Sequence, residues 1–241
     1  MEAEREQMNT YSNPVVLELV EGQAPCAVFS SNPAYEYKEK PVYDAIKRVC
    51  DVVLASIALV VLFPFLLLVA IAIVIDDPHG APIFVQMRGG KNNIPFKFYK
   101  FRSMVKEADA LKDSLQDKNE VDGPIFKMTD DPRVTRIGAL IRKTSIDELP
   151  QLWNVIKGDM SLVGPRPLPV KESDGCTPYE KHRLDVIPGL TCYWQCRGRS
   201  NLSFQDMIRL DFLYLRERSI ITDLKILFST VGAVIKMVGA E

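Results

Sequence analysis

The longest apolar run in the chain spans residues 52–75 and contains no charged side chain. As one helix, these 24 residues would reach about 36 Å, enough to cross a hydrocarbon core of about 30 Å. Pro64 stands near the midpoint of the run. Because proline lacks a backbone donor and clashes with the preceding turn, we expect a kink or a break near Phe63. Each half would reach about 18 Å, which suits a re-entrant helical hairpin in one leaflet.

Basic residues flank this run on both sides. They are Lys38, Lys40, Lys47 and Arg48 before it, and Arg88, Lys91, Lys97, Lys100 and Arg102 after it. Positive charge beside a membrane segment favours the cytosolic side, so basic residues at both ends suit a hairpin that enters and leaves by one face. A kinked helix that crosses the membrane once also fits, and these residues alone leave both arrangements open.

The pattern in the rest of the chain predicts an α+β fold that is mostly α. Helices are predicted over residues 104–118, 133–143, 149–158 and 203–218. Two β-prone runs, 83–87 and 96–101, flank a stretch with glycine and asparagine pairs and predict a small antiparallel β element. Prolines predict an extended loop over 163–169, and Pro188-Gly189 predicts a turn.

The last segment carries an apolar stripe at helical spacing. It consists of Leu224, Leu227, Phe228, Val231, Val234, Ile235 and Val238, with Lys225 and Lys236 outside it. Such a stripe commonly packs against a core, but it also suits an amphipathic helix that lies in the membrane interface. The membrane-length run upstream favours the interface.

Composition narrows the class of protein. The 241 residues carry a formal net charge of −1, which gives no reason to expect a nucleic acid as partner. Basic residues nevertheless crowd the middle of the sequence, where they suit phosphates or lipid head groups, although a solvated basic face needs no ligand. Five cysteines without framework spacing indicate free thiols in a reducing compartment. Two histidines exclude a histidine-rich metal site.

An acidic pair is the best candidate for chemistry. Asp147 and Glu148 lie at the start of a predicted helix, where backbone amides and the helix dipole favour an ionised carboxylate. One such carboxylate can attack phosphorus, and its neighbour can hold Mg²⁺ together with substrate phosphates. The same residues also fit a capping box, in which Ser145 is the cap and Glu148 reaches back to it. Taken alone, this short pattern favours the capping box.

Two further segments present basic side chains to a candidate site. The prolines of Gly164-Pro-Arg-Pro167 restrict the backbone around Arg166, which suits bidentate phosphate recognition. A rigid linker with an exposed arginine explains these four residues equally well. Strand alternation puts Lys100 and Arg102 on one face, which is either a phosphate-binding face or a charged outer face.

Four long segments occur in a fixed order along the chain. They read KFYKFRSM, FKMTDDPRVTRIGALIRKTSIDELPQLWNVIKGDMSLVGPRP, PGLTCYWQCRGRS and DLKILFSTV. Together they resemble the bacterial sugar transferases, the monotopic polyprenyl-phosphate phosphoglycosyl transferases, over about residues 41–238. The resemblance implies transfer of sugar-1-phosphate from a UDP-sugar to undecaprenyl phosphate with release of UMP. The product would start a surface glycan such as an exopolysaccharide, capsule or lipopolysaccharide.

The resemblance also implies roles for individual residues. Asp147 would become covalently phosphorylated by the sugar phosphate, and Glu148 would bind Mg²⁺. Pro165, Arg166 and Pro167 match the family's turn near the phosphates. The other candidate substrate-binding residues are Lys100, Arg102 and Arg142.

A membrane location follows from the same resemblance. The family has a re-entrant helix broken at a proline, which matches Pro64 and favours the hairpin, although Phe63 stands where many members have serine. We expect a polar, largely disordered leader at 1–40 and an amphipathic lead-in with the hairpin at 41–78. A catalytic domain at 79–241, ending in an interfacial helix, would lie on the cytosolic face of the bacterial inner membrane.

Several partners are expected from this assignment. They are a UDP-sugar, undecaprenyl phosphate, inner-membrane lipid and downstream glycosyltransferases, with a homo-oligomer allowed and no nucleic acid. A hexose donor such as galactose or glucose is favoured over an N-acetylated sugar. The competing interpretation is a non-enzymatic membrane anchor or scaffold that binds anionic lipid or a partner from a glycan pathway.

Overall fold

The computed structural model describes residues 37–115, 117, 119, 128, 131–197 and 202–235. The chain divides into two compact units, Met1–Glu36 and Tyr37–Glu241, and all described residues belong to the second unit. Most of the predicted polar leader therefore lies outside the described residues, as does the end of the helix predicted over 104–118.

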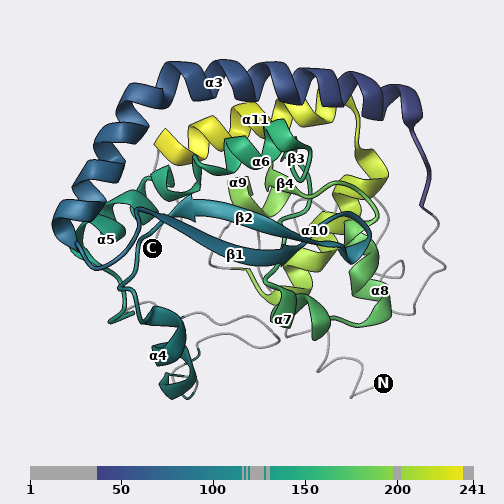
Figure 1. The fold of residues 1–241 in the computed structure, drawn as a ribbon. Helices are drawn as coiled ribbons and strands as arrows, with labels where there is room; N and C mark the ends of the chain where they lie inside the picture. The colour runs from purple at the N-terminus through teal and green to yellow at the C-terminus, as the bar shows by residue number, and fades with distance from the viewer. Residues whose placement is uncertain are drawn as a thin grey trace. The chain divides into compact units, whose positions relative to one another are not determined.

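Among its described residues the second unit is mostly helical, as the pattern predicted, and it contains two small sheets where the pattern predicted one β element (Figure 1). Its α-helices are α3 (Pro41–Asp76), α4 (Ala108–Ser114), α5 (Arg136–Lys143), α6 (Gln151–Lys157), α7 (Val170–Asp174), α8 (Pro178–Lys181), α9 (Tyr193–Arg197), α10 (Phe204–Glu217) and α11 (Ile220–Ile235). Short 3-10 helices are η2 (Lys91–Asn93), η4 (Ile146–Glu148) and η5 (His182–Leu184). The strands are β1 (Ile83–Gly89), β2 (Pro95–Phe101), β3 (Ser161–Val163) and β4 (Gly189–Thr191).

The membrane-length run forms most of α3. Pro64 lies inside this helix, which continues through it to Asp76. The ribbon of α3 bends in its second half, so the structure contains one bent helix rather than two antiparallel halves (Figure 1). By length and composition α3 alone among the described residues qualifies to cross a membrane, and only 17% of its most apolar window is buried. Such exposure is unlike that of a core helix.

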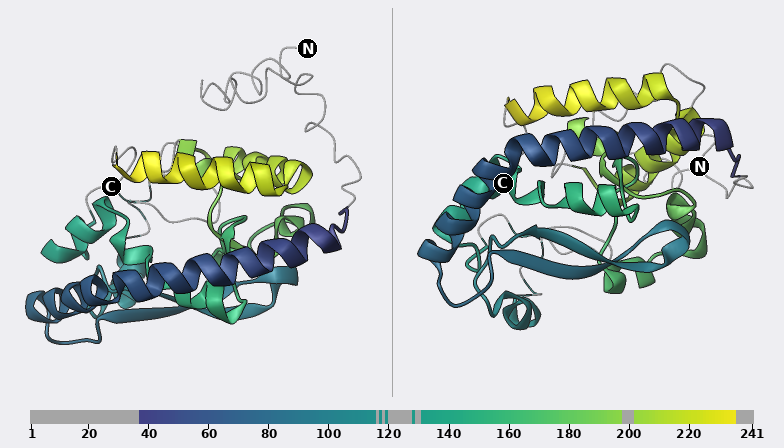
Figure 2. Two further views of the ribbon diagram at one scale, coloured as in Figure 1. Left: turned by 90° about the horizontal axis from the view of Figure 1, so that it is seen from above. Right: turned by 45° about the horizontal axis from the view of Figure 1, so that its top comes forward.

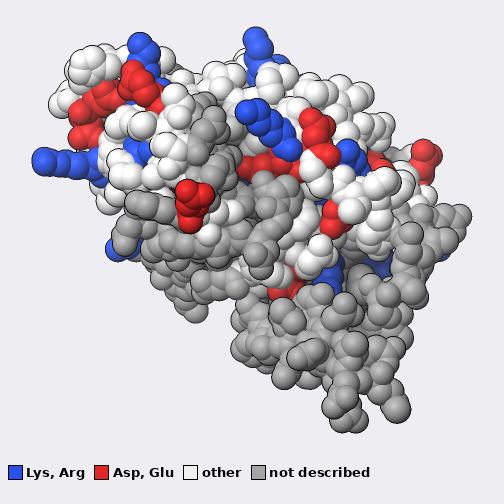
Figure 3. Space-filling view, turned by 90° about the horizontal axis from the view of Figure 1, so that it is seen from below, with Lys and Arg blue, Asp and Glu red and all other residues white. Residues whose placement is uncertain are grey.

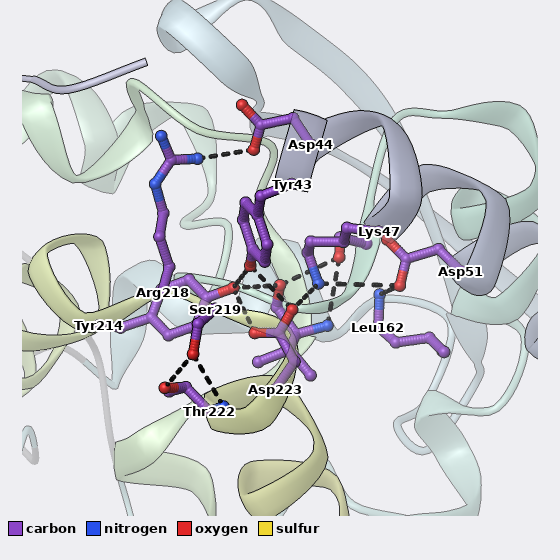
Figure 4. Close-up of polar contacts among 12 residues, drawn as sticks. Tyr43, Asp44, Lys47, Asp51, Leu162, Tyr214, Arg218, Ser219, Thr222 and Asp223 are labelled. Atoms are coloured by element: carbon purple, nitrogen blue, oxygen red, sulfur yellow. Dashed lines mark hydrogen bonds and ion pairs between the residues drawn. The ribbon is translucent and has the colours of Figure 1, made fainter. Parts of the chain in front are cut away.

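Polar side chains fasten the first half of α3 to the domain (Figure 4). The carboxylate of Asp223, in α11, accepts hydrogen bonds from Tyr43 at 2.8 Å and from Lys47 at 2.9 Å. Tyr214, in α10, donates to the other oxygen of Asp223 at 2.9 Å. One turn further along α3, Asp51 accepts a bond from the backbone N–H of Leu162 at 3.1 Å.

The far end of α3 is fastened to the same domain. Asp76 accepts a hydrogen bond from the backbone N–H of Ile137, at the start of α5, at 3.0 Å. The next residue, Asp77, pairs with Arg102 at 3.0 Å, just after β2. The second half of α3 also packs on a buried cluster that contains Leu66, Val69, Ile73, Phe101 and Ile141. Both ends of one apolar helix are therefore held by one domain.

The predicted β-hairpin is confirmed, and its register determines which side chains share a face. Strands β1 and β2 pair antiparallel, with Phe84 opposite Lys100 and Arg88 opposite Phe96. Because residues alternate between faces, Arg88 and Lys100 lie on the same face of the hairpin.

The sequence predicted a turn at Pro188-Gly189, but the second of these residues belongs to a strand. Gly189 begins β4, which pairs in parallel with β3. A Cβ at Gly189 would lie 2.0 Å from the backbone nitrogen of Gly164, so only glycine permits this close approach. The Pro-Gly pair therefore marks a contact between two chain segments.

Helix α11 carries its apolar stripe on the outside. Phe228 is 76% exposed and Val231 58% exposed, whereas Asp223, Ile226 and Ala233 face the interior. Burial of the stripe against the core is therefore excluded for these two described members. Helices α3 and α11 lie along the same side of the domain (Figure 1, Figure 2).

On the face seen from below in Figure 3, acidic and basic side chains are both present.

Candidate active site

The acidic pair lies in η4, directly before α6. Ser145 adopts the left-handed conformation with φ of 58° and makes no side-chain cap, so the predicted capping box is absent. This conformation costs free energy for a residue that has a Cβ, and it turns the chain sharply between α5 and η4. Ile146 and Leu149 pack against the cluster beneath α3. The acids therefore sit between two apolar anchors, close to the apolar helix.

The carboxylate of Glu148 accepts two hydrogen bonds from the guanidinium of Arg166. One guanidinium nitrogen donates to Oε2 at 2.9 Å, and the other donates to Oε1. Burial alone would raise the pKa of Glu148, but the charge and hydrogen bonds of Arg166 outweigh it and hold this pKa below its usual value. Glu148 is therefore ionised at neutral pH. The prolines on either side of Arg166 lie in a loop, as the sequence predicted.

Asp147 is held in a different electrostatic state from its neighbour. Its side chain is buried, and this burial, followed by the negative charge of Glu148, raises its pKa to about 6. The positive charges of Lys100, Arg166 and Arg142 oppose that rise. The carboxylate is thus mostly ionised at neutral pH but is less stabilised than an exposed one, as suits a nucleophile.

Two cations reach the acids from the β-hairpin. Burial lowers the pKa of Lys100 to about 8, against the raising effect of Asp147. Burial likewise lowers the pKa of Arg88 to about 9. Arg88 also stacks over the ring of Phe98, 4.0 Å from its centroid. Our sequence reasoning missed Arg88 as a site residue, although the predicted hairpin could have revealed it by its alternation with Lys100.

The predicted substrate-binding residues do not all converge. Lys100, Arg142 and Arg166 all act electrostatically on Asp147. Arg102 instead pairs with Asp77 at the end of α3, and its side chain is 8% exposed. Strand alternation fails as a guide here because β2 ends at Phe101, one residue before Arg102. Arg102 therefore makes a supporting contact in the structure, and its role in substrate binding stays a prediction.

The acid pair also fits a divalent cation. Mg²⁺ usually takes one or two protein carboxylates and completes its shell with phosphates and water. The repulsion of Asp147 by Glu148 is the kind of charge that a cation relieves. No group of three or more potential metal ligands occurs within the described part of the chain, so the remaining ligands would come from substrate and water.

The arrangement as a whole suits phosphoryl chemistry. It combines an ionised, oriented acid, a second carboxylate of contrasting pKa, and several partly buried cations that match anionic substrates. Its position against the apolar helix α3 brings this chemistry close to a surface on which a lipid could lie.

Comparison with known proteins places the chain in a family. The model of the bacterial sugar transferases matches residues 42–237. The chain therefore belongs to the bacterial sugar transferase family.

Curated relatives share this region. The galactosyl transferase CpsE of Streptococcus agalactiae is 46% identical over 198 residues, which cover 81% of this chain and 43% of the relative. The UDP-galactose-lipid carrier transferase of Erwinia amylovora is 40% identical over 203 residues, covering 81% of this chain and 41% of the relative. A UDP-N-acetylgalactosamine-undecaprenyl-phosphate N-acetylgalactosaminephosphotransferase of Aeromonas hydrophila is 38% identical over 207 residues, covering 83% and 46%. The chain thus spans less than half the length of these relatives.

Proposed function

We propose that this protein transfers sugar-1-phosphate from a UDP-sugar to undecaprenyl phosphate, with release of UMP. The product, an undecaprenyl-diphosphate sugar, would start a surface polysaccharide. Family membership and the names of the relatives support this reaction. The single observation that carries the proposal is the acid pair, in which Arg166 holds Glu148 ionised while burial raises the pKa of Asp147.

The proposed reaction has two displacements at one phosphorus atom. A carboxylate oxygen of Asp147 attacks the phosphorus that bears the sugar, a new O–P bond forms, and the bond to UMP breaks. A phosphate oxygen of undecaprenyl phosphate then attacks the same phosphorus and releases the carboxylate. One nucleophile thus serves two substrates in turn, and no net proton is needed for either displacement.

The basic residues around Asp147 account for the binding of anionic substrates. Arg88 and Lys100 approach from the β-hairpin, and Arg142 from α5. Their charges would offset the repulsion between the carboxylate and a diphosphate. We propose Glu148, with Asp147, as the protein ligands of Mg²⁺, which when bound would neutralise phosphate charge.

We further propose that α3 is re-entrant and that the domain lies on the cytosolic face of the inner membrane. The contacts at its two ends support this topology, because Asp223 accepts hydrogen bonds from Tyr43 and Lys47, while Asp77 accepts one from Arg102. A helix that crossed the bilayer would place these two ends in different compartments, and one folded domain could not hold both. Pro64 favours a bend in α3, and such a bend would allow the helix to turn back within one leaflet.

Helix α11 would lie in the interface beside it, since Phe228 and Val231 are exposed and α11 runs along the same side of the domain as α3. This arrangement brings a lipid-linked phosphate to the depth at which the acid pair sits. It also accounts for the exposed apolar surface, which the stability of the fold does not explain.

A panel of UDP-sugars with undecaprenyl phosphate, followed by UMP release, tests the proposed reaction. We expect turnover with at least one hexose donor, and galactose is favoured by two of the relatives' names. UDP-N-acetylgalactosamine is the informative comparison donor, because the name of one relative includes this sugar. A non-enzymatic scaffold would release no UMP from any donor and would bind anionic lipid regardless of Asp147.

A further inference from the structure

The loop that carries Arg166 depends on donors from outside itself. It contains Pro165, Pro167 and Pro169, which have no backbone N–H and cannot build hydrogen-bonded structure. The carbonyls of residues 165–168 nevertheless all accept hydrogen bonds. The donors, in order, are Gly189 N–H at 2.9 Å, Arg183 at 2.6 Å, Arg88 at 2.9 Å and Gly89 N–H at 3.0 Å.

Arg183 is the more deeply buried of the two side-chain donors. It comes from η5, is 1% exposed, and donates through Nε to the carboxylate of Asp211 at 2.7 Å. Asp211, in α10, is fully buried. Within the described part of the chain, Nη1 of Arg183 and Oδ1 of Asp211 have no hydrogen-bond partner.

Such a pair is a poor way to gain stability. Two charges lose their hydration, and here each keeps one polar atom unsatisfied, so an apolar pair of similar volume would often be as stable or more so. What an apolar pair could not supply is the hydrogen bond from Arg183 to the carbonyl of Arg166. That bond holds the backbone of Arg166, and the guanidinium of the same residue donates to Glu148.

The geometry also requires arginine rather than lysine at this position. Its planar fork reaches Asp211 with Nε and the carbonyl of Arg166 with Nη2 at the same time. A lysine ammonium is a single point of charge and cannot span both acceptors in this fixed geometry.

We propose that Arg183, locked by Asp211, is a positioning residue for the transfer reaction. It fixes the backbone of Arg166 so that this side chain holds Glu148 ionised beside Asp147. The inference rests on the proposed function for its catalytic consequence, but not for the predicted orientation of Arg166. Its effect passes through Arg166, and Arg183 itself need not touch substrate.

The test compares two arginine-to-lysine substitutions in the full chain. Arg183→Lys keeps the positive charge beside Asp211 but removes the second donor. The matched control is Arg133→Lys, because Arg133 is also buried, pairs with Asp131 at 2.6 Å and donates to the carbonyl of Ala108 at 3.1 Å. Both of these partners lie outside the loop that carries Arg166.

Two readouts separate positioning from general stability. Mass spectrometry measures the reactivity of Arg166 toward phenylglyoxal, and UMP release measures kcat. In Arg183→Lys we expect Arg166 to become more reactive and kcat to fall by about 10- to 100-fold, since a small misplacement of a catalytic group has effects of this size. In Arg133→Lys both quantities should stay at wild-type values, even if its Tm falls.

A second variant keeps the proposal falsifiable if Arg183→Lys folds poorly. Arg183→Met combined with Asp211→Leu removes both buried charges and should retain the fold, yet Arg166 should again be more reactive and kcat lower. Wild-type reactivity of Arg166 in that folded double variant would overturn the proposal. Equal loss of kcat in the two arginine-to-lysine variants, without a change at Arg166, would also overturn it. If the wild-type protein turns over no UDP-sugar, the proposed function fails, while Arg166 reactivity still decides the positioning role.

Discussion

Arg102 and Asp77 form an ion pair at 3.0 Å that joins the end of β2 to the residue that closes α3. Arg102 also donates to the backbone carbonyl of Asp77. Both side chains are largely buried. This pair, with Asp76 on the N–H of Ile137, ties the far end of the apolar helix to the segment that precedes the acid pair.

Substituting Arg102 should therefore affect stability more than substrate binding. We expect Arg102→Met to lower the Tm, because Asp77 would keep its negative charge without the partner that closes the end of α3. Thermal unfolding in detergent measures this, and the KM for UDP-sugar of the folded enzyme should stay unchanged. Lys100→Met is the comparison, with a raised KM and little loss of stability. Equal increases in KM for both variants would contradict the assignment.

Removal of magnesium should stop turnover, and Glu148 should determine how much metal is needed. We expect a chelator to abolish UMP release and added Mg²⁺ to restore it. Glu148→Gln should require at least about 10-fold more Mg²⁺ for half-maximal rate, since losing one carboxylate charge weakens a hard cation site. Asp174→Asn, at an exposed acid in α7, is the control. A Glu148→Gln enzyme with an unchanged magnesium requirement would refute this role.

Activity should depend on pH through Asp147. Because burial and Glu148 raise the pKa of Asp147 to about 6, we expect kcat/KM to fall as pH drops through about 6 and the nucleophile gains a proton. A profile flat down to pH 5 would argue against Asp147 as the titrating group.

The same shift gives Asp147 an effect on stability. Between the usual 3.8 and about 6, the folded protein holds a proton that the unfolded chain has lost, so stability falls as pH rises through this window. Asp147→Asn carries no charge to bury and should unfold at a higher Tm than wild type above pH 6, while losing activity. A lower Tm in that variant would contradict the sign.

Both ends of α3 should face one compartment. Single cysteines in place of Glu39 and His79, both exposed, flank the helix in a background without other cysteines. In sealed inner-membrane vesicles a membrane-impermeant maleimide should label both positions from the cytosolic side and neither from the other. Labelling from opposite sides would show that α3 crosses the membrane.

Sequence reasoning predicted the apolar helix, the β-hairpin and most of the longer helices, but it missed strands β3 and β4 and the short helices α7, α8 and α9. The β-hairpin, the loop around Arg166 and the cap of α10 at Ser203 follow from local patterns. The pairing of Arg102 with Asp77 does not, because it joins segments 25 residues apart. Ser145 misled the motif search, since its left-handed backbone turns the side chain out of the capping geometry.

Positioning residues were the hardest to predict. Arg183 and Asp211 lie in no motif, and their ion pair exists only because η5 and α10 meet in the fold. Arg88 could have been found from the register of the hairpin. Of the two outcomes expected near Phe63, a kink or a break, the structure contains a bend without a break, because a bend relieves the clash at Pro64 while the helix continues.

The most direct test of the central claim is mass spectrometry of the protein after brief exposure to a UDP-hexose, without undecaprenyl phosphate. The account predicts a hexose-phosphate adduct on the peptide that contains Asp147, absent in Asp147→Asn and lost when the lipid acceptor is added. Undecaprenyl-diphosphate sugar that forms normally while no adduct can be trapped, or that still forms in Asp147→Asn, would contradict it.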